Sequence, residues 1–505
     1  MKSRNIKKIL LLQPNYAWLN KRTLRFPTYT LALLKACLDT QYETTIFDPN
    51  FNNLSEDEVF RYIKKLDPNL VGITSNSTEY LATSRLTTSI TRRALPNAII
   101  VLGGVMPTVL IEEAMKDENV DYWIMGEGEY SFPHLINELQ NGKANLSNVN
   151  GLAYWKDGKS CINKKVFIEN LDNIPFPVYS NIVGGFNEQT LSLHDYGNVR
   201  LKYDATLYAT NYPFAYSITS RGCPFRCVFC AGRTVSGRKV RFRSAENVLA
   251  EIDSLYNSGI REIIFLDDHF LANKKRALDI MNGIIDRKYN MTWKCSNVTA
   301  WLLDEELLET MHNSGCNFIT ASLESGNQYV VDNIIKKPVK LKKIHPIFNM
   351  AKSIGFDIVV NFIIGFPGET WDQIRDTFSF AEKLSVDICN FHIATPLPKT
   401  ELMDVCLRES LLPEDFIENF SKYSGFGKGL ITTNEFTPFE LEILRSFEWD
   451  RINFSSEERK SSVARLNGIT IEELEEWRRG TRRNIGVNDR MHSFLTRGEN
   501  QKSNE

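Results

Sequence analysis

The stretch Ser220-Arg-Gly-Cys-Pro-Phe-Arg-Cys-Val-Phe-Cys-Ala231 dominates the interpretation of this chain, because it holds three cysteines at the spacing Cys-x-x-x-Cys-x-x-Cys. Thiolates this close in sequence, from Cys223, Cys227 and Cys230, can bind one iron–sulfur cluster, since a tight loop lets each sulfur point at a shared centre. A cubane cluster has about four irons, so three ligands leave one iron without a protein donor. That iron is open to a substrate or a cofactor.

Two other roles for these cysteines fit the sequence less well. A structural zinc site normally needs a fourth Cys or His at a regular offset, and none follows nearby. Disulfides are typical of secreted chains, whereas this chain shows no secretory signal and has nine cysteines, an odd count. The remaining six cysteines are scattered, mostly in apolar surroundings, which is typical of buried small hydrophobes: Cys37, Cys161, Cys295, Cys316, Cys389 and Cys406.

Length and charge limit the class of protein. A chain of 505 residues is long enough for two or three domains, each with its own core. The 60 lysines and arginines nearly balance the 62 acidic residues, so no bulk basicity indicates a nucleic-acid partner. No apolar run reaches membrane-spanning length. We therefore expect a cytoplasmic protein in a reducing compartment, with no nucleic acid and no membrane as a partner.

Residues 1–145 alternate short apolar strands with helical stretches, which predicts an α/β fold with a doubly wound parallel sheet. The expected strands are Ile9–Leu12, Thr44–Phe47, Leu70–Thr74, Ile99–Leu102 and Tyr122–Met125. Such sheets bind ligands beyond the carboxyl ends of their strands. Residues suited to ligand binding follow three of these strands: Ser75, Ser77 and Thr78; Gly103, Gly104, Pro107 and Thr108; and Gly126, Glu127, Gly128 and Glu129. On this evidence alone the glycines either admit a flat ligand or simply make turns.

The rest of the chain divides into three expected regions. Residues 146–212 form a connector with a small hairpin around Asp157-Gly158, and residues 406–505 a helical carboxyl-terminal region. Residues 213–405 hold six strand-like runs, which predict an incomplete parallel (β/α) barrel with its active residues at the carboxyl ends of the strands. These runs are Tyr216–Thr219, Glu262–Leu266, Thr292–Ser296, Phe318–Leu323, Ile358–Ile364 and Ile388–Ala394.

The order of these motifs resembles that of the cobalamin-binding radical S-adenosylmethionine (SAM) enzymes, over roughly residues 5–405. The resemblance rests on a strand that ends in Gly-Gly-x-x-Pro-Thr, a later Gly-Glu-Gly-Glu, and the cysteine loop. It implies a Rossmann-like domain that holds cobalamin over the barrel mouth, and a [4Fe–4S] cluster on the three cysteines with SAM at the open iron. The implied SAM contacts are Phe229 at the adenine, Asp267 and Asp268 at the amino group, Glu324 at the ribose, Ile363 and Gly365 beside the adenine, and Thr395 after the sixth strand.

Three positions depart from the family pattern or stay ambiguous. Many cobalamin domains supply a histidine to cobalt from an Asp-x-His-x-x-Gly loop, but this loop reads Asp48-Pro-Asn-Phe-Asn-Asn53, so no histidine of the usual loop can bind cobalt. The third barrel strand ends in Cys295-Ser-Asn297, where relatives often carry an arginine. His269 and His392 are candidate general acids, and a structural role is equally consistent with the sequence.

The resemblance also implies a reaction. An electron from the cluster cleaves SAM, the resulting deoxyadenosyl radical removes a hydrogen from an unactivated carbon, and methylcobalamin donates its methyl group to that carbon. We therefore expect a methyltransferase for a small-molecule or natural-product-like substrate, with an electron donor such as flavodoxin or ferredoxin. Three alternatives remain: a cyclisation or rearrangement without methyl transfer, a radical SAM enzyme with a vestigial cobalamin domain, and a cluster-bearing sensor. A sensor would not need the amino, ribose and adenine contacts.

Overall fold

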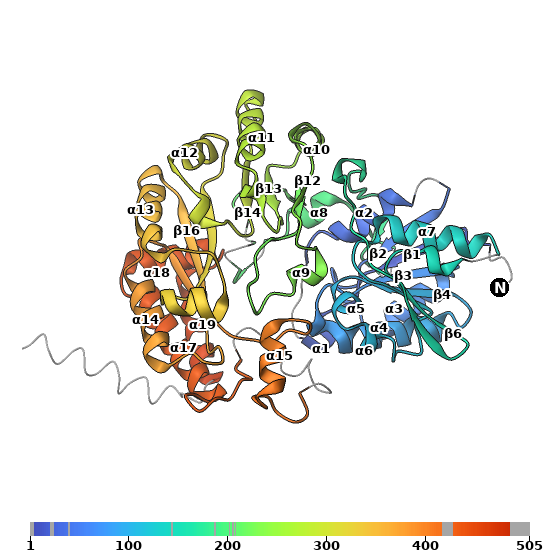
Figure 1. The fold of residues 1–505 in the computed structure, drawn as a ribbon. Coiled ribbons are helices and arrows are strands. Elements are labelled where there is room, and N and C mark those ends of the chain that lie inside the picture. Colours follow the sequence, from blue (N-terminus) through green and yellow to red (C-terminus); the bar gives the residue numbers. More distant parts are fainter. Residues whose placement is uncertain are drawn as a thin grey trace, which may run out of the picture.

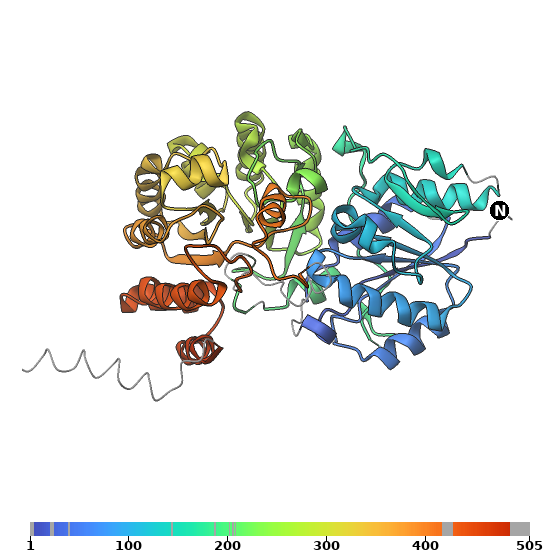
Figure 2. The same cartoon turned by 60° about the horizontal axis from the view of Figure 1, so that its bottom comes forward.

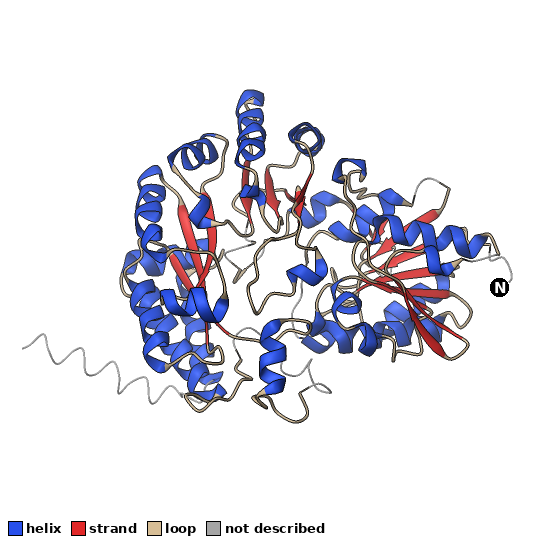
Figure 3. Cartoon of the chain, viewed as in Figure 1, coloured by secondary structure: helices blue, strands red, loops and turns tan. Residues whose placement is uncertain are grey.

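A computed structural model describes residues 5–20, 25–38, 41–142, 145–185, 188–200, 202–204, 207, 209–416 and 428–484. In this part of the chain two α/β units lie side by side (Figure 1). Strands form the centre of each unit and helices cover them (Figure 3). The cysteine loop and the short helix α9 (Gly232–Val235) lie between the two units (Figure 1).

The amino-terminal unit is built on a nine-stranded sheet with the order β7-β6-β5-β4-β3-β1-β2-β8-β9. Its five central strands are parallel and fall where the sequence predicts them: β1 (Lys8–Leu12), β2 (Glu43–Phe47), β3 (Leu70–Thr74), β4 (Ile99–Gly103) and β5 (Tyr122–Ile124). Successive residues of β1 enter different cores, since Leu10 packs on one face of the sheet and Leu11 on the other. A sheet buried on both faces explains why these strands are continuously apolar.

Helices cover both faces of this sheet, as expected for a doubly wound fold. The longer ones are α2 (Tyr29–Cys37), α3 (Glu56–Leu66), α4 (Leu81–Ala94) and α7 (Gly128–Gln140), and the short ones are α1 (Ala17–Asn20), α5 (Val105–Val109), α6 (Ile111–Ala114) and α8 (Leu193–Gly197). Residues of α3 and α4 join the core of one face, and residues of α2 and α7 join the other. Ser55 begins α3 with a capping box to Glu58, which satisfies backbone donors at the helix start.

Segments of the expected connector extend the first sheet at both edges. The hairpin of β6 (Leu152–Lys156) and β7 (Lys159–Ile162) turns at Asp157-Gly158 and adds two antiparallel strands beside β5. At the opposite edge β8 (Ile182–Val183) pairs with β2 and is followed by β9 (Thr190–Leu191). The sheet therefore continues past residue 145, because these segments pair with its edge strands rather than forming a separate layer.

The second unit contains the six predicted parallel strands as two three-stranded sheets, β10-β13-β14 and β15-β16-β17. An isolated bridge between Val298 and Ala321 links the two sheets, which gives a six-stranded partial barrel. The strands are β10 (Phe214–Ser217), β13 (Glu262–Phe265), β14 (Thr292–Cys295), β15 (Phe318–Glu324), β16 (Asp357–Ile364) and β17 (Ile388–Ile393). Helices α10 (Ala245–Asn257), α11 (Lys274–Arg287), α12 (Glu305–Asn313), α13 (Ile344–Ile354) and α14 (Trp371–Glu382) follow in alternation.

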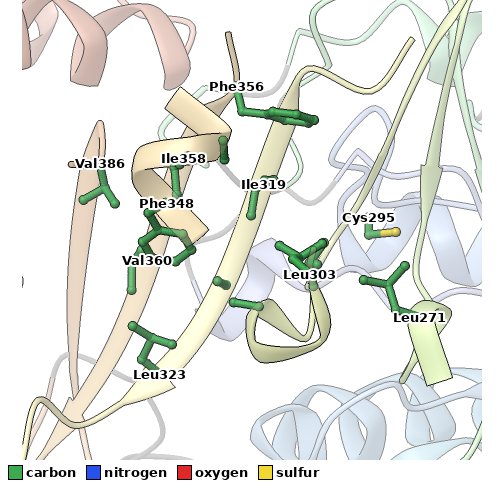
Figure 4. Close-up of a cluster of buried hydrophobic side chains, with 14 of the residues drawn as sticks. Leu271, Cys295, Leu303, Ile319, Leu323, Phe348, Phe356, Ile358, Val360 and Val386 are labelled. Carbon is green, nitrogen blue, oxygen red and sulfur yellow. The ribbon is translucent and has the colours of Figure 1, made fainter. Parts of the chain in front are cut away.

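The barrel core lies between these strands and their covering helices. Figure 4 shows Ile319 and Leu323 of β15 and Ile358 and Val360 of β16 near Phe348 of α13. All of these side chains belong to one buried cluster. This core supports the carboxyl ends of the strands, where the candidate site is built.

Carboxyl-terminal helices close the open edge of the barrel beside β17. They are α17 (Pro438–Asn453), α18 (Glu457–Leu466) and α19 (Ile471–Asn484), and they run beneath the barrel in the view of Figure 2. Asn453 binds both the backbone N–H and the backbone C=O of Cys389, each at 2.8 Å, which satisfies part of the edge strand. Trp449 is buried in the barrel core and Trp477 packs against it.

Candidate active site

The cysteine loop begins after β11 (Ser220–Arg221), which pairs with β12 (Arg241–Phe242), and continues into α9. Gly222 has a φ of +98°, and a Cβ there would lie 2.3 Å from the carbonyl oxygen of Lys239, so only glycine fits. Cys223, Cys227 and Cys230 are all free thiols, and the backbone N–H of Gly232 donates to the sulfur of Cys230 at 3.3 Å. A thiolate set with a backbone donor suits an iron–sulfur cluster.

The geometry of the described residues does not favour a single metal ion. No three His, Cys, Asp or Glu side chains within these residues converge on one ion position. A cluster does not require such convergence, because each cysteine binds a different iron. The three cysteines therefore fit a cluster better than a zinc site.

Two neighbouring carboxylates after β13 anchor the start of this loop. Asp267 accepts hydrogen bonds from the backbone N–H of Thr219 at 2.7 Å and from the hydroxyl of Ser220 at 2.7 Å, and it is 4% exposed. Asp268 accepts from the backbone N–H of Gly222 at 2.8 Å. The carboxylate of Asp267 is buried against the loop, where burial raises its pKa, and its contact with the SAM amino group stays a prediction.

A cavity of about 450 Å³ opens at the barrel mouth beside the loop, and we call it the barrel-mouth cavity. Five residues named from the sequence line it: Phe229, Cys230, Glu324, Ile363 and Thr395. Ser322, Asn361 and His392 add polar groups from three different strands. Gly365 is not among the lining residues; its backbone N–H donates to Glu369 at 2.7 Å in the turn after β16. Its role is therefore to shape the turn.

Glu324 has a partner that the sequence did not reveal. Its carboxylate binds the ammonium group of Lys337 at 2.6 Å, and the two side chains are only 6% and 9% exposed. The backbone of Glu324 has a φ of +69°, which re-aims the end of β15. A buried ion pair of this kind fixes the position of the carboxylate at the cavity wall.

A second cavity, of about 300 Å³, lies at the carboxyl edge of the first sheet, and we call it the sheet-edge cavity. Gly103, Gly104, Gly126 and Gly128 form part of its wall, together with residues of the cysteine loop such as Arg221. Apolar side chains form much of the remainder: Leu11, Leu31, Leu34, Val101, Ile124 and Phe132. Glycine backbone beside an apolar slot is suited to a large flat ligand.

The two cavities share one wall. Val235, the last residue of α9, lines both the barrel-mouth and the sheet-edge cavity. Helix α9 also contacts α5, which follows the Gly103-Gly104 turn. One short helix directly after the last cysteine therefore separates the two sites.

Comparison with known proteins decides the family. A sequence model described as the radical SAM superfamily matches residues 217–381, and one described as a B12 binding domain matches residues 18–136. A protein of Pyrococcus horikoshii named as an uncharacterized methyltransferase is 32% identical over 83% of this chain and 86% of its own. The chain belongs to the cobalamin-binding radical SAM enzymes.

More distant relatives have the same arrangement of domains. Cytidylyl-2-hydroxyethylphosphonate methyltransferase of Streptomyces wedmorensis is 27% identical over 84% of this chain and 86% of its own. The solved structure of the radical SAM methyltransferase TsrM from Kitasatospora setae superposes with a TM-score of 0.68 at 17% identity, over 81% of this chain and 79% of that one. This likeness supports the fold of a B12-binding domain joined to a partial barrel.

Membership makes a [4Fe–4S] cluster, SAM and cobalamin the cofactors of this radical SAM protein. No helix within the described residues has the length and apolar character needed to cross a membrane.

Several hydroxyl residues expected to contact cobalamin instead support the sheet-edge turns. The hydroxyl of Thr108 donates to the carbonyl of Gly104 at 2.6 Å and accepts from the N–H of Gly126 at 2.7 Å. Ser75 is fully buried and accepts a hydrogen bond from Ser84 at 2.8 Å. None of Ser75, Ser77, Thr78, Pro107 and Thr108 is among the residues that line the sheet-edge cavity. Ser75 and Thr108 therefore have hydrogen-bond partners within the fold, and ligand contact at these five positions stays a prediction.

The carboxylates of the Gly-Glu-Gly-Glu motif join the two units of this enzyme. Glu129 binds Arg221 of the cysteine loop at 2.5 Å, and Glu127 binds Arg221 at 3.2 Å and Arg241 at 2.8 Å. Both glutamates line the sheet-edge cavity, but these ion pairs occupy their charged ends. The glycines of the motif line the sheet-edge cavity beside these paired carboxylates.

The loop that replaces the usual histidine is closed by a buried aspartate. Asp48 is 1% exposed and accepts from the hydroxyl of Tyr196 at 2.7 Å. Burial raises the pKa of Asp48 to about 7. Neither residue is among those lining the sheet-edge cavity, and no histidine is among the described residues that do.

The two candidate general acids differ in position. His269 is buried beside Phe225, and its ring nitrogen lies 3.1 Å from the hydroxyl of Thr299, which indicates a structural role. His392 lines the barrel-mouth cavity, where burial lowers its pKa to about 4. A neutral imidazole at pH 7 can accept or donate one hydrogen bond but is a poor general acid.

Proposed function

We propose that this radical SAM protein methylates a carbon atom of a small-molecule substrate. The observation that carries the proposal is the shared wall, because Val235 lines both cavities. When bound, SAM with the cluster supplies a deoxyadenosyl radical that removes hydrogen from carbon, and cobalamin supplies the methyl group. Radical and methyl donor must act on one substrate, and two cavities on either side of one short helix suit that requirement.

The residues at the barrel mouth have separate roles in this proposal. Cys223, Cys227 and Cys230 hold the cluster and leave one iron open to SAM. Glu324 accepts hydrogen bonds from the ribose hydroxyls, with Lys337 holding its carboxylate in place. Phe229, Ile363 and Thr395 flank the adenine, and Asp268, the exposed member of its pair, receives the amino group.

The sheet-edge cavity is proposed to hold cobalamin. Gly103, Gly104, Gly126 and Gly128 allow the corrin to approach the backbone, and the apolar slot between Leu34 and Phe132 suits its benzimidazole base. No described histidine lines this cavity, so the residues present would hold cobalamin without an imidazole ligand from the protein. Cobalamin bound there would supply the methyl group.

The names of the relatives support the choice of reaction. The two relatives described above, at 32% and 27% identity, are both named as methyltransferases, and one name specifies a cytidylylated phosphonate. We propose a small polar substrate of comparable size and a one-electron donor such as flavodoxin or ferredoxin. Asn361 and His392, with an amide and an imidazole group, line the barrel-mouth cavity in which the substrate would be oriented.

The test uses the anaerobically reconstituted protein with methyl-deuterated SAM and a low-potential reductant. A panel of small molecules, including cytidylylated phosphonates, is added, and deoxyadenosine, S-adenosylhomocysteine and label in the product are measured. Methylation predicts both nucleoside products and transfer of the labelled methyl group to a carbon. Deoxyadenosine with an unlabelled, rearranged product and no S-adenosylhomocysteine would replace this proposal with a cyclisation or rearrangement.

A further inference from the structure

Four charged side chains form a buried ion-pair group between the two units, and we call it the interdomain clasp: Glu127, Glu129, Arg221 and Arg241. Its side chains are 7%, 8%, 14% and 2% exposed, respectively. Two carboxylates and two guanidinium groups balance one another, so the group carries no net charge. Such balance is what allows four charges to be removed from water together.

The clasp is continuous with the cofactor sites on both sides. Arg221 stands two residues before Cys223, at the start of the cluster loop. Glu127 stands between Gly126 and Gly128 of the sheet-edge cavity, Glu129 follows Gly128, and α7 begins within the same motif. A displacement at either end of the clasp is therefore transmitted to a cofactor-binding segment through one or two residues of backbone.

The two arginines are held side by side by the glutamate between them. Arg221 and Arg241 are direct cross-strand partners of the β11–β12 ribbon, where like charges repel. Glu127 binds both, and its other oxygen accepts from the backbone N–H of Ile168 at 2.6 Å. Arg241 in turn donates to the carbonyl of Ile168 at 2.7 Å. The ribbon, the connector and the first sheet thus meet at one carboxylate.

Another ion pair between these segments is less suited to fixing the distance between the sheet-edge cavity and the cluster loop. The pair of Lys239 and Glu169 has side-chain exposures of 73% and 68%, and solvent screens an ion pair of this kind. Arginine is better suited to fixing a distance, because its planar fork binds two carboxylates in a defined geometry. Arg221 uses both terminal nitrogens, one for each glutamate.

We propose that the interdomain clasp is a positioning device that fixes the distance between the sheet-edge cavity and the cluster loop. Arg221 acts through the loop and Glu129 through the glycine turn, so both are positioning residues. Cleavage of SAM needs only the cluster loop and the barrel-mouth cavity, whereas methyl transfer needs both cavities at a fixed distance from each other. A shift of about 1 Å between reacting groups can lower a rate by about 10²-fold.

The test compares Arg221→Met, Arg221→Lys and Glu129→Gln in the full chain, reconstituted with iron, sulfide and hydroxocobalamin. Glu129→Gln preserves shape and serves if Arg221→Met does not fold. Lys239→Met, which breaks the exposed pair, is the matched control. With cobalt reduced to cob(II)alamin, electron paramagnetic resonance measures how strongly the reduced cluster speeds cobalt spin relaxation, an effect that falls steeply with distance. This readout needs no substrate and no methyl transfer.

The expected result distinguishes a changed distance between cluster and cobalt from a general loss of folded structure. At iron and cobalt contents matched to wild type, cobalt relaxation in Arg221→Met and Glu129→Gln should slow or become heterogeneous. Arg221→Lys should recover part of the effect and Lys239→Met should match wild type. A second measurement, S-adenosylhomocysteine formation, rests on the proposed function and should fall about 10²-fold in Arg221→Met.

Two outcomes would overturn the inference. The first is unchanged cobalt relaxation in Arg221→Met at equal iron and cobalt content. The second is an equal change in Lys239→Met. If wild type forms no S-adenosylhomocysteine, the proposed methyl transfer fails, but the relaxation measurement still decides whether the clasp sets the distance.

Discussion

The barrel-mouth cavity and the sheet-edge cavity differ in how many of their motif residues face the cavity and how many bond to other parts of the fold. At the barrel mouth, Phe229, Glu324, Ile363 and Thr395 line the cavity, as expected from their positions at strand ends. At the sheet edge, the hydroxyl groups of the motifs bond to neighbouring turns, and the carboxylates bond across to arginines. The glycines line the cavity itself. In a crowded edge, polar residues must satisfy one another, so residue type alone does not separate ligand contacts from scaffold.

The largest effect is expected on the barrel side, from Cys223→Ala. Loss of one of three ligands should remove the cluster, because no other described cysteine stands in the loop to replace it. Deoxyadenosine formation should fall to background, with iron content lost and the sheet-edge cavity intact. Cobalt binding measured in the same sample is the control. Normal deoxyadenosine formation in this variant would refute the cluster assignment.

The next effect tests the sheet edge through two adjacent glycines. Gly104 has a φ of +104°, and a Cβ there would lie 2.6 Å from the carbonyl oxygen of Ser75, which is itself bonded to the N–H of Met106. We expect Gly104→Ala to lower the free energy of unfolding by about 2 kcal/mol or more. Thermal unfolding of the cofactor-free protein measures it.

Gly103→Ala is the matched variant for that comparison. Its added Cβ would meet nothing nearer than the carbonyl oxygen of Ile124, at 3.9 Å, so stability should change by less than about 0.5 kcal/mol. Since Gly103 lines the sheet-edge cavity, retained cobalt should nevertheless fall. Full cobalt retention in Gly103→Ala would show that the corrin does not approach this turn.

A smaller effect is expected from Glu324→Gln at the barrel mouth. The neutral amide still accepts a hydrogen bond from Lys337 but loses the charge that strengthens bonds to ribose hydroxyls. The SAM concentration needed for half-maximal deoxyadenosine formation should rise about ten-fold, with little change in the maximal rate. Glu401→Gln, which breaks the exposed pair with Lys336, is the control. Equal responses of the two variants would contradict a ribose contact.

A pH-dependent effect concerns Asp48, in the loop that replaces the usual histidine. Burial raises its folded-state pKa to about 7 from 3.8, so the folded state binds its proton more tightly than the unfolded state. The stability it contributes is present in full below pH 4 and is lost as the pH rises to 7, at about 1.4 kcal/mol per pH unit. Asp48→Asn removes this dependence. The unfolding midpoint of the variant, relative to that of wild type, should therefore rise between pH 5 and pH 8. A constant difference across this range would show that Asp48 ionises normally.

Sequence patterns predicted the strands well, because continuous apolar runs identify buried parallel strands. All eleven expected parallel strands occur within a few residues of their predicted ends. The extension of the first sheet by β8 could not be predicted, since a two-residue strand has no periodicity. The links of Arg221 to Glu129 and of Lys337 to Glu324 also join residues 92 and 13 positions apart. Local patterns contain no signal for ion pairs of this separation, nor for the hydrogen bonds that join Asp267 to Thr219 and Ser220.

The central claim, that one chain holds both an iron–sulfur cluster and cobalamin at adjoining cavities, is tested most directly by metal content. The protein is reconstituted anaerobically with iron, sulfide and hydroxocobalamin, and then desalted. We predict about four irons and about one cobalt per chain. Four irons without cobalt would contradict the account, because the sheet-edge cavity would then be only a scaffold for the barrel.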